Sequence, residues 1–475
     1  MGEVNPYYVV IGFSLAIIVS YLFNIISKKT NIPSVLLLIV MGILVQQSFD
    51  FFGVKTLNLF PILEILGIVG LIMIVLEAAL DLELKKEKWP IIWKSFVVAF
   101  LGLAGSMFFI SLLINAFLAT NYQIALLYAI PLSIISSAIV IPSVTSLDEF
   151  KHEFMVYEST FSDILGIMAF YFLLGDMEAT GESNFFATVS LNVVVTILVS
   201  FVASYLLILL FQQIKTKTKL FLLISVLILL YDLAKLMHLS SLLIILVFGL
   251  ILNNHKLFFA GFLEKYIKDD AIKDNLSNFK LITLETAFVV RTFFFLIFGM
   301  TISLKSLVNL NVFIISALIL GFIFMSRFFS MRAIVGKNVK TLTLIAPRGL
   351  ITILLFFSIP VAFQQDAFDP GILLYVIILS SLLMTYALID DKKQKLKLEA
   401  QQEVYSELLE GALYIEQCLA AHKVKKKAAW EKIAAELQDR ATQGAASKTL
   451  FDPSMEAFFK TYPLKKLVTK SLVQG

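Results

Sequence analysis

Apolar runs long enough to cross a lipid bilayer recur along the first 390 residues of this chain. A transmembrane helix needs about 17 to 25 such residues, and thirteen runs of roughly this kind can be counted. They cover residues 7–27, 32–49, 60–82, 91–118, 122–145, 153–175, 185–213, 219–237, 239–252, 280–304, 311–330, 341–362 and 371–389. Only 16% of the 475 residues are charged, against roughly 25% in soluble domains. The sequence therefore predicts an all-α polytopic membrane protein with thirteen transmembrane helices.

Lysine and arginine in the loops indicate the orientation, because cytoplasmic loops carry an excess of both. With the N-terminus outside, eighteen of these residues fall in cytoplasmic loops, and only Lys55, Lys235 and Lys305 fall outside. Miscounting one helix would exchange the sides of every later loop, so the bias supports the count as well. The sequence predicts an N-out, C-in, multi-pass protein of a plasma (inner) membrane. The short N-terminal segment and the lack of glycosylation-rich loops favour a prokaryotic one.

The composition changes at Asp390, where the apolar runs stop and charged residues alternate with apolar ones at helical spacing. Residues 1–390 are predicted to form the transmembrane domain, and residues 391–475 a cytoplasmic, mostly helical tail. Two readings of the tail remain: it regulates the membrane domain by binding a partner or ligand, or it is a solvated helix without a specific role. The single cysteine, Cys418, excludes an intrachain disulfide and a cysteine-based metal cluster. No cofactor and no nucleic-acid partner are expected.

Two predicted spans contain proline together with small polar residues or glycine. They are AIPLSIISSAIVIPSV at 129–144 in the fifth span and LTLIAPRGLITILLFFSIP at 342–360 in the twelfth. Proline removes a backbone donor and clashes with the preceding turn, so both helices are expected to be broken inside the membrane. Their separation by seven positions in helix order is typical of two inverted six-helix repeats whose broken helices cross at the ion site of a secondary transporter.

Ionisable residues inside the predicted spans are costly, and by default they belong to a site or have a partner. The central ones are Glu77, Glu158, Asp163, Arg291, Arg327 and Arg348. Glu158 and Asp163 share the sixth span, but helical geometry places them about 140° apart and about 7.5 Å along the axis. The two carboxylates therefore cannot serve one ion side by side.

The simplest account gives these two carboxylates different roles. An arginine neutralises one of them permanently, because a buried ion pair survives where a lone charge would not. The other has no permanent cation, so either a proton or a metal ion must meet its charge, which is an antiport mechanism. Ser162 and the unwound backbone would supply neutral oxygens, which suit hard cations.

Several motifs in order resemble the monovalent cation/proton antiporter superfamily, in its sodium/proton exchanger type. These are VLEAALDLEL in the third span, SSAIVIPSV in the fifth, ESTFSD in the sixth, RTFFFLIFGM in the tenth, SRFFSMR in the eleventh and PRGLI in the twelfth. The likeness covers about residues 7–389. It implies a homodimer with a core domain of helices 4–6 and 11–13, which moves like an elevator, and a scaffold of the remaining helices at the dimer contact.

The resemblance also implies roles for individual residues. Asp163 matches the aspartate that binds Na+ and the proton. Ser162 replaces the asparagine that usually precedes it, and Ser136 and Ser137 replace the threonine and aspartate of many relatives' fifth span. We therefore expect Asp163, Ser162, Ser136 and Ser137 to form the ion-binding site.

The remaining buried charges are expected to support this site. Glu158 matches the glutamate that pairs with an arginine of the eleventh helix, for which Arg327 is the candidate, and Arg348 matches the arginine beside the broken twelfth helix. We expect Glu77 and Arg291 to be structural or vestibule residues.

The leading hypothesis is a secondary active transporter that exchanges Na+, Li+ or K+ for H+, with one cation per proton and therefore no net charge movement. A potassium efflux channel or exchanger of the same fold is the alternative, although the tail has no G-x-G-x-x-G motif of a nucleotide-binding domain. A membrane enzyme is disfavoured, because G-x-S-x-G and H-E-x-x-H are both absent.

Overall fold

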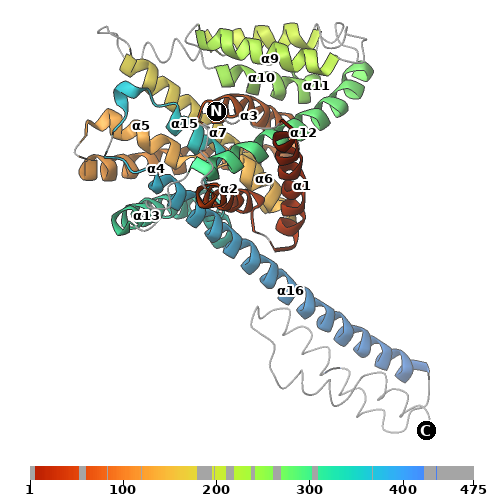
Figure 1. The fold of residues 1–475 in the computed structure, drawn as a ribbon. Helices are drawn as coiled ribbons and strands as arrows, with labels where there is room; N and C mark the ends of the chain where they lie inside the picture. Colours follow the sequence, from red (N-terminus) through yellow and green to blue (C-terminus); the bar gives the residue numbers. More distant parts are fainter. Residues whose placement is uncertain are drawn as a thin grey trace. The chain divides into compact units, whose positions relative to one another are not determined.

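The structure is a computed structural model, and it describes residues 6–30, 32–52, 60–82, 84–118, 120–178, 195–196, 198–209, 219–236, 241–259, 269–301, 309–337, 339–365, 367–421 and 435. Every regular element within these ranges is a helix (Figure 1). The chain divides into two compact units, residues 1–389 and residues 390–475. The first unit contains the predicted spans.

The helices follow the apolar runs of the sequence. In chain order they are α1 (Pro6–Thr30), α2 (Ser34–Phe51), α3 (Phe60–Asp81), α4 (Trp89–Leu118), α5 (Tyr122–Ser133), α6 (Ser137–Ser143), α7 (Glu149–Glu178), α9 (Lys219–Leu236), α10 (Ser241–Asn253), α11 (His255–Phe258), α12 (Asp269–Thr301), α13 (Leu310–Ile334), α14 (Lys340–Leu344), α15 (Leu350–Phe357) and α16 (Gly371–Ala421). Short 3-10 turns lie at Lys86–Lys88, Val144–Ser146 and Val361–Phe363.

Eight helical segments of the described residues are long and apolar enough to cross a membrane. The other predicted spans are represented by α3, by the shorter apolar helices Leu198–Leu209 and Ser241–Asn253, by α9 and by the interrupted pair α14 and α15. Much of the predicted span 185–213, and the tail beyond residue 421 apart from residue 435, lie outside the described residues. The all-helical membrane fold is confirmed, and the count of thirteen stays a prediction.

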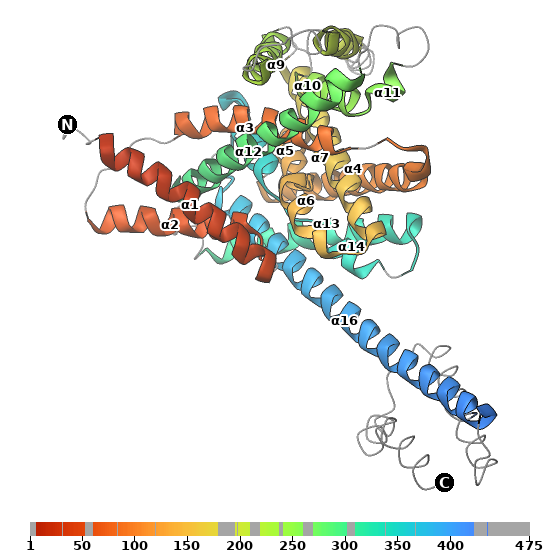
Figure 2. The ribbon, with the colours of Figure 1, turned by 90° about the vertical axis from the view of Figure 1, so that its right-hand side faces the viewer.

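One group of helices packs around α12. The helix α12 packs against both α2 and α3, and α3 in turn packs against α10 (Figure 2). The contact of α12 with α2 depends on two glycines: a Cβ on Gly42 would lie 2.1 Å from the Leu296 carbonyl oxygen, and one on Gly299 would lie 2.4 Å from that of Ile39. These backbones approach so closely that side chains at either position would force the helices apart.

A second group of helices packs around α4, which contacts α5, α7 and α13. Its buried face includes small residues, and a Cβ on Gly105 would lie 2.3 Å from the Ser326 hydroxyl of α13. Ser95 of α4 donates to the Phe154 carbonyl of α7 at 3.2 Å. The second group therefore joins the helix that contains Glu158 and Asp163 to the helix that contains Arg327.

The fifth and twelfth predicted spans are both interrupted. Residues 134–136 separate α5 from α6, and residues 345–349 separate α14 from α15. The sequence attributes both breaks to proline, but the structure differs in the fifth span: Pro131 and Pro142 lie inside α5 and α6, on either side of the break. In the twelfth span, Pro347 lies within the break itself. A proline near a helix end removes a backbone hydrogen bond without occupying the residue at which the helix stops.

Candidate ion-binding site

Asp163 lies on α7 beside the start of α6, and only 4% of its surface is exposed. Its Oδ2 accepts a hydrogen bond from the backbone N–H of Ser137, the first residue of α6, at 3.0 Å. Its Oδ1 is buried and has no hydrogen-bond partner among the residues that the structure describes. A helix N-terminus favours negative charge because its first N–H groups have no partner within the helix. One oxygen of Asp163 is thus held by backbone while the other is left for a ligand.

Two backbone N–H groups within the fifth-span break also have partners from outside it. Ile135 donates to the hydroxyl of Ser162 at 3.0 Å, so the residue before Asp163 holds the same break. Ser136 donates to the carbonyl of Pro347, in the break of the twelfth span, at 2.9 Å. The two interrupted helices therefore meet at their unwound segments, and α7 binds the first of them twice.

Ser136 and Gly349 also approach closely between the two breaks. A Cβ on Gly349 would lie 2.6 Å from the Ser136 hydroxyl oxygen, which only a residue without a side chain permits. That hydroxyl is buried and has no partner within the described part of the chain. The four predicted site residues Asp163, Ser162, Ser136 and Ser137 therefore all lie around one break, and two of them present a free polar oxygen.

Glu158, one turn and a half before Asp163 on α7, is fully buried against an arginine. Both of its oxygens accept hydrogen bonds from Arg327 of α13, one from Nη1 and the other from Nη2 at 3.1 Å. Arg327 also donates to the carbonyls at the C-terminal end of α14, those of Leu342, Thr343 and Ile345. All three guanidinium nitrogens of Arg327 therefore donate hydrogen bonds, and the bidentate pair with Glu158 is the arrangement that a buried arginine favours.

Arg348 occupies the matching position at the end of α5. Its Nε donates to the Leu132 carbonyl at 3.0 Å and its Nη2 to the Ser133 carbonyl at 3.1 Å. Nη1 donates to the carbonyl of Ala346 within its own break. Positive charge is favourable at a helix C-terminus, and both α5 and α14, which end at the two breaks, have an arginine on their terminal carbonyls.

Glu77 and Arg291 come together as a pair outside this centre. Arg291 of α12 places Nη2 3.4 Å from Oε2 of Glu77 on α3. Its Nη1 donates to the carbonyl of Ala138, in the first turn of α6, at 3.1 Å. The pair therefore touches the same half-helix whose N-terminus faces Asp163, a link that sequence reasoning missed.

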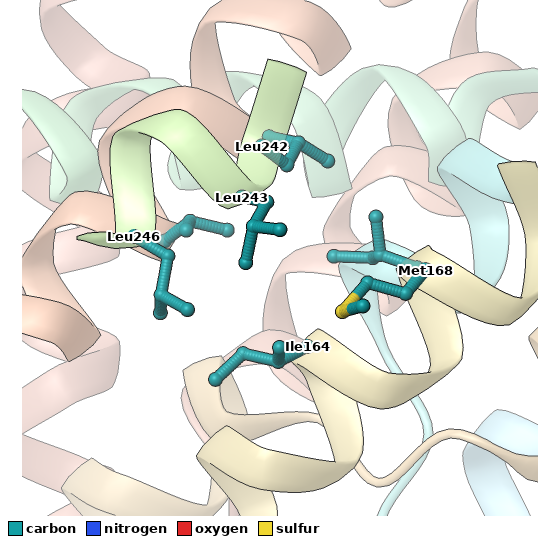
Figure 3. Close-up of a pocket in the computed structure, with 7 residues that line it drawn as sticks. Ile164, Met168, Leu242, Leu243 and Leu246 are labelled. Atoms are coloured by element: carbon teal, nitrogen blue, oxygen red, sulfur yellow. The ribbon is translucent and has the colours of Figure 1, made fainter. Parts of the chain in front are cut away.

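A small apolar pocket lies between α7 and α10. Figure 3 shows Ile164 and Met168 of α7 facing Leu242, Leu243 and Leu246 of α10 across it. Aliphatic and thioether side chains offer no hydrogen bonds to water. The pocket itself therefore offers no ligand for an ion.

Sequence reasoning also missed Ser380 of α16, whose hydroxyl accepts from the backbone N–H of Arg348 at 3.1 Å. A serine in an apolar helix gives no signal that distinguishes this role. Among the described residues, no group of three or more histidine, cysteine, aspartate or glutamate side chains could hold a metal ion.

Comparison with protein families gives a match over most of the chain. The family described as "Sodium/hydrogen exchanger, transmembrane" matches residues 14–388. The chain belongs to the sodium/hydrogen exchanger family. It is therefore a multi-pass membrane transporter and not an enzyme, and the resemblance inferred from its motifs is confirmed at the level of the family.

Solved structures agree on the fold of this exchanger. Two structures of the sodium proton antiporter MjNhaP1 from Methanocaldococcus jannaschii match with TM-scores of 0.60 and 0.58. The first is 19% identical in sequence and covers 80% of this chain and 95% of the other; the second is 20% identical and covers 81% and 95%. No curated protein matches. Separately, residues 391–474 match a family described as "Alpha-1,4-glucan:maltose-1-phosphate maltosyltransferase, domain N/S".

Proposed function

We propose that this exchanger moves Na+ in one direction and H+ in the other, with Asp163 binding either ion in turn. The observation on which the proposal rests is the state of that carboxylate. It is buried, one oxygen is held by the Ser137 N–H, and the other has no hydrogen-bond partner among the described residues. A buried carboxylate in this condition needs a positive charge, which a proton or a cation supplies.

Neutral oxygens around Asp163 complete the proposed site. Ser136 has a buried hydroxyl without a described partner, beside the Gly349 contact. The hydroxyl of Ser162 accepts from Ile135, which leaves its second lone pair for a ligand. Carboxylate and hydroxyl oxygens are the ligands that hard cations prefer. When the cation leaves, a proton on Asp163 restores neutrality, so the two ions exclude each other.

We further propose that one cation exchanges for one proton, so that transport is electroneutral. Glu158 is neutralised by Arg327 through two hydrogen bonds. Arg348 is held by backbone carbonyls at the end of α5. Asp163 is then the single carboxylate at the break that changes its occupant.

An elevator movement of a core domain is proposed on the packing of the helices. The core would contain α4 to α7 and α13 to α16, and the scaffold would contain the helices packed around α12. The pocket between α7 and α10 is lined by apolar side chains, which would slide past one another without breaking hydrogen bonds, whereas the bond from Arg291 of α12 to the Ala138 carbonyl of α6 would have to break. We also propose the topology that the sequence predicts, with thirteen helices in two inverted repeats and the N-terminus outside. The scaffold would form the contact of a homodimer. The location would be a prokaryotic plasma membrane. Residues 391–475 would form a cytoplasmic tail that binds a regulatory partner.

Dissipation of a preset pH gradient in proteoliposomes tests the proposal. Na+, Li+ and K+ are added separately to vesicles containing the wild type, Asp163→Asn or Glu153→Gln. Glu153 is the matched control, because it lies on the same helix and pairs with Lys88 instead. Exchange is expected for the wild type and the control and not for Asp163→Asn, which keeps the shape of the side chain without its charge.

Two outcomes would overturn the proposal, and a third would change the proposed cation. Equal exchange by Asp163→Asn and the wild type would remove Asp163 from the chemistry. Cation-driven flux without coupled proton movement would instead indicate a channel, the alternative that the sequence leaves open, and a response to K+ alone would change the proposed cation.

A further inference from the structure

The carbonyl of Ala138 loses its usual partner because of the sequence of α6. In an α-helix the carbonyl of residue i accepts from the N–H of residue i+4. Four residues after Ala138 is Pro142, which lies inside α6 and has no N–H. Ala138 is buried, and a buried carbonyl without a donor is costly. The first turn of α6 therefore requires a donor from another part of the chain.

Arg291 supplies this donor from α12. Its Nη1 donates to the Ala138 carbonyl at 3.1 Å, while its Nη2 lies 3.4 Å from Oε2 of Glu77 on α3. The planar guanidinium serves two acceptors from two different nitrogens held in a fixed geometry, whereas a lysine has a single nitrogen on a flexible stem. Glu77 thus fixes the direction in which Arg291 points.

The first turn of α6 also contains the N–H that holds the ion-binding carboxylate. Ser137 directly precedes Ala138, and its N–H donates to Asp163 Oδ2 at 3.0 Å. These groups belong to adjacent residues of one short helix of seven residues. A shift of this turn that relieved the Ala138 carbonyl would therefore also move the Ser137 N–H away from Asp163.

We propose that Arg291 is a positioning residue of the ion-binding site: it replaces the donor that Pro142 lacks and so keeps the Ser137 N–H directed at Asp163. Glu77 assists by holding Arg291. The inference deepens the proposed function and, for its transport readout, rests on it. Because Arg291 acts through the backbone of α6, its loss should affect the concentration of Na+ needed for half-maximal exchange more than the maximal rate.

A rescue experiment tests this route. Replacing Pro142 by alanine restores an N–H four residues after Ala138, so the helix can satisfy its own carbonyl. The double variant Glu77→Gln/Arg291→Met removes both charges of the Glu77–Arg291 pair, so neither is left alone. Exchange is measured in proteoliposomes across a range of Na+ concentrations for the wild type, Pro142→Ala, the double variant and the triple variant.

The double variant is expected to need on the order of tenfold more Na+ for half-maximal exchange, a factor in keeping with the loss of one charge-assisted hydrogen bond. Adding Pro142→Ala should return this Na+ concentration to within about twofold of the wild-type value. A twofold difference corresponds to less than half the energy of one charge-assisted hydrogen bond. Pro142→Ala alone should leave this concentration nearly unchanged. An equal defect in the double and triple variants would overturn the inference, because the pair would then act through its charges and not through the Ala138 carbonyl.

Thermal unfolding of the purified variants separates this inference from the proposed function. The Tm lost in the double variant should be partly recovered in the triple variant, whether or not the protein exchanges ions. If the wild type shows no exchange but this recovery is seen, the proposed function fails and the Arg291 contact stands. If exchange is normal and neither Tm nor Na+ dependence is recovered, the contact fails and the proposed function stands.

Discussion

Glu158 and Asp163 lie five residues apart on α7, and of the two only Glu158 has an arginine bonded to both of its oxygens in the described part of the chain. The same helix thus presents one carboxylate that is neutralised within the protein and one that meets a backbone N–H. Their surroundings differ because they face different neighbours, α13 and α14 for Glu158 and the break before α6 for Asp163.

Glu158→Gln should destabilise the fold, because it leaves Arg327 buried without its counter-charge. Breaking such a pair costs about 3 to 5 kcal/mol of the free energy of unfolding. The measurement is denaturation of the purified protein. The control is Glu153→Gln, which removes the partly exposed pair with Lys88 and should cost less than about 1 kcal/mol. Similar losses of unfolding free energy in both variants would show that the buried Glu158–Arg327 pair stabilises the fold no more than the partly exposed Glu153–Lys88 pair does.

Arg348→Lys should also destabilise the protein, although the charge is kept. The guanidinium donates to the carbonyls of Leu132, Ser133 and Ala346, and one ammonium cannot reproduce this geometry. With two carbonyls left unsatisfied, the expected loss is about 2 to 4 kcal/mol in the free energy of unfolding. Arg332→Lys is the matched control, because Arg332 lies at the exposed end of α13 and donates to a single carbonyl. A stable, fully active Arg348→Lys variant would contradict the assigned role.

Gly349→Ala should separate the two breaks. The added Cβ would lie 3.0 Å from the Cβ and 2.6 Å from the hydroxyl oxygen of Ser136, whose own backbone is bonded to Pro347. We expect at least a tenfold loss of exchange in proteoliposomes, and a destabilisation of about 1 to 3 kcal/mol from overpacking. Gly321→Ala on α13 is the control, since no atom lies within 4 Å of its added Cβ and alanine favours a helix. Normal exchange by Gly349→Ala would show that the breaks tolerate a wider spacing.

Membrane potential should not change the rate of exchange. If Asp163 alone alternates between one Na+ and one proton, no net charge crosses the membrane in a cycle. The rate is measured in proteoliposomes with ionophore-imposed potentials of either sign at a constant pH gradient. A rate that rises with one sign of potential and falls with the other would mean that a second group, for example Glu77, also changes its charge.

Much of the fold could be predicted from the sequence because the bilayer restricts it so strongly. A run of apolar residues of the right length can satisfy its backbone within a membrane only as a helix. The helices α1, α2, α3, α4, α7 and α13 therefore lie close to the predicted spans, whereas α12 begins at Asp269, well before the predicted start at residue 280. The exact position of the fifth-span break was not predictable from proline alone, because Ser162 and Asp163 of another helix bind the N–H groups that the break exposes.

The sequence by itself determined that this chain is a helical membrane protein, that a few charges are buried in it, and that two helices are interrupted. It did so through local properties: the length of apolar runs, the scarcity of charge and the chemistry of proline. Tertiary structure alone decided which groups meet. It brings Arg327 to Glu158, Pro347 to Ser136, and Arg291 to the carbonyl that Pro142 leaves without a donor. These contacts join residues far apart in the chain, and packing between helices, rather than any local pattern, sets the distances at which they form.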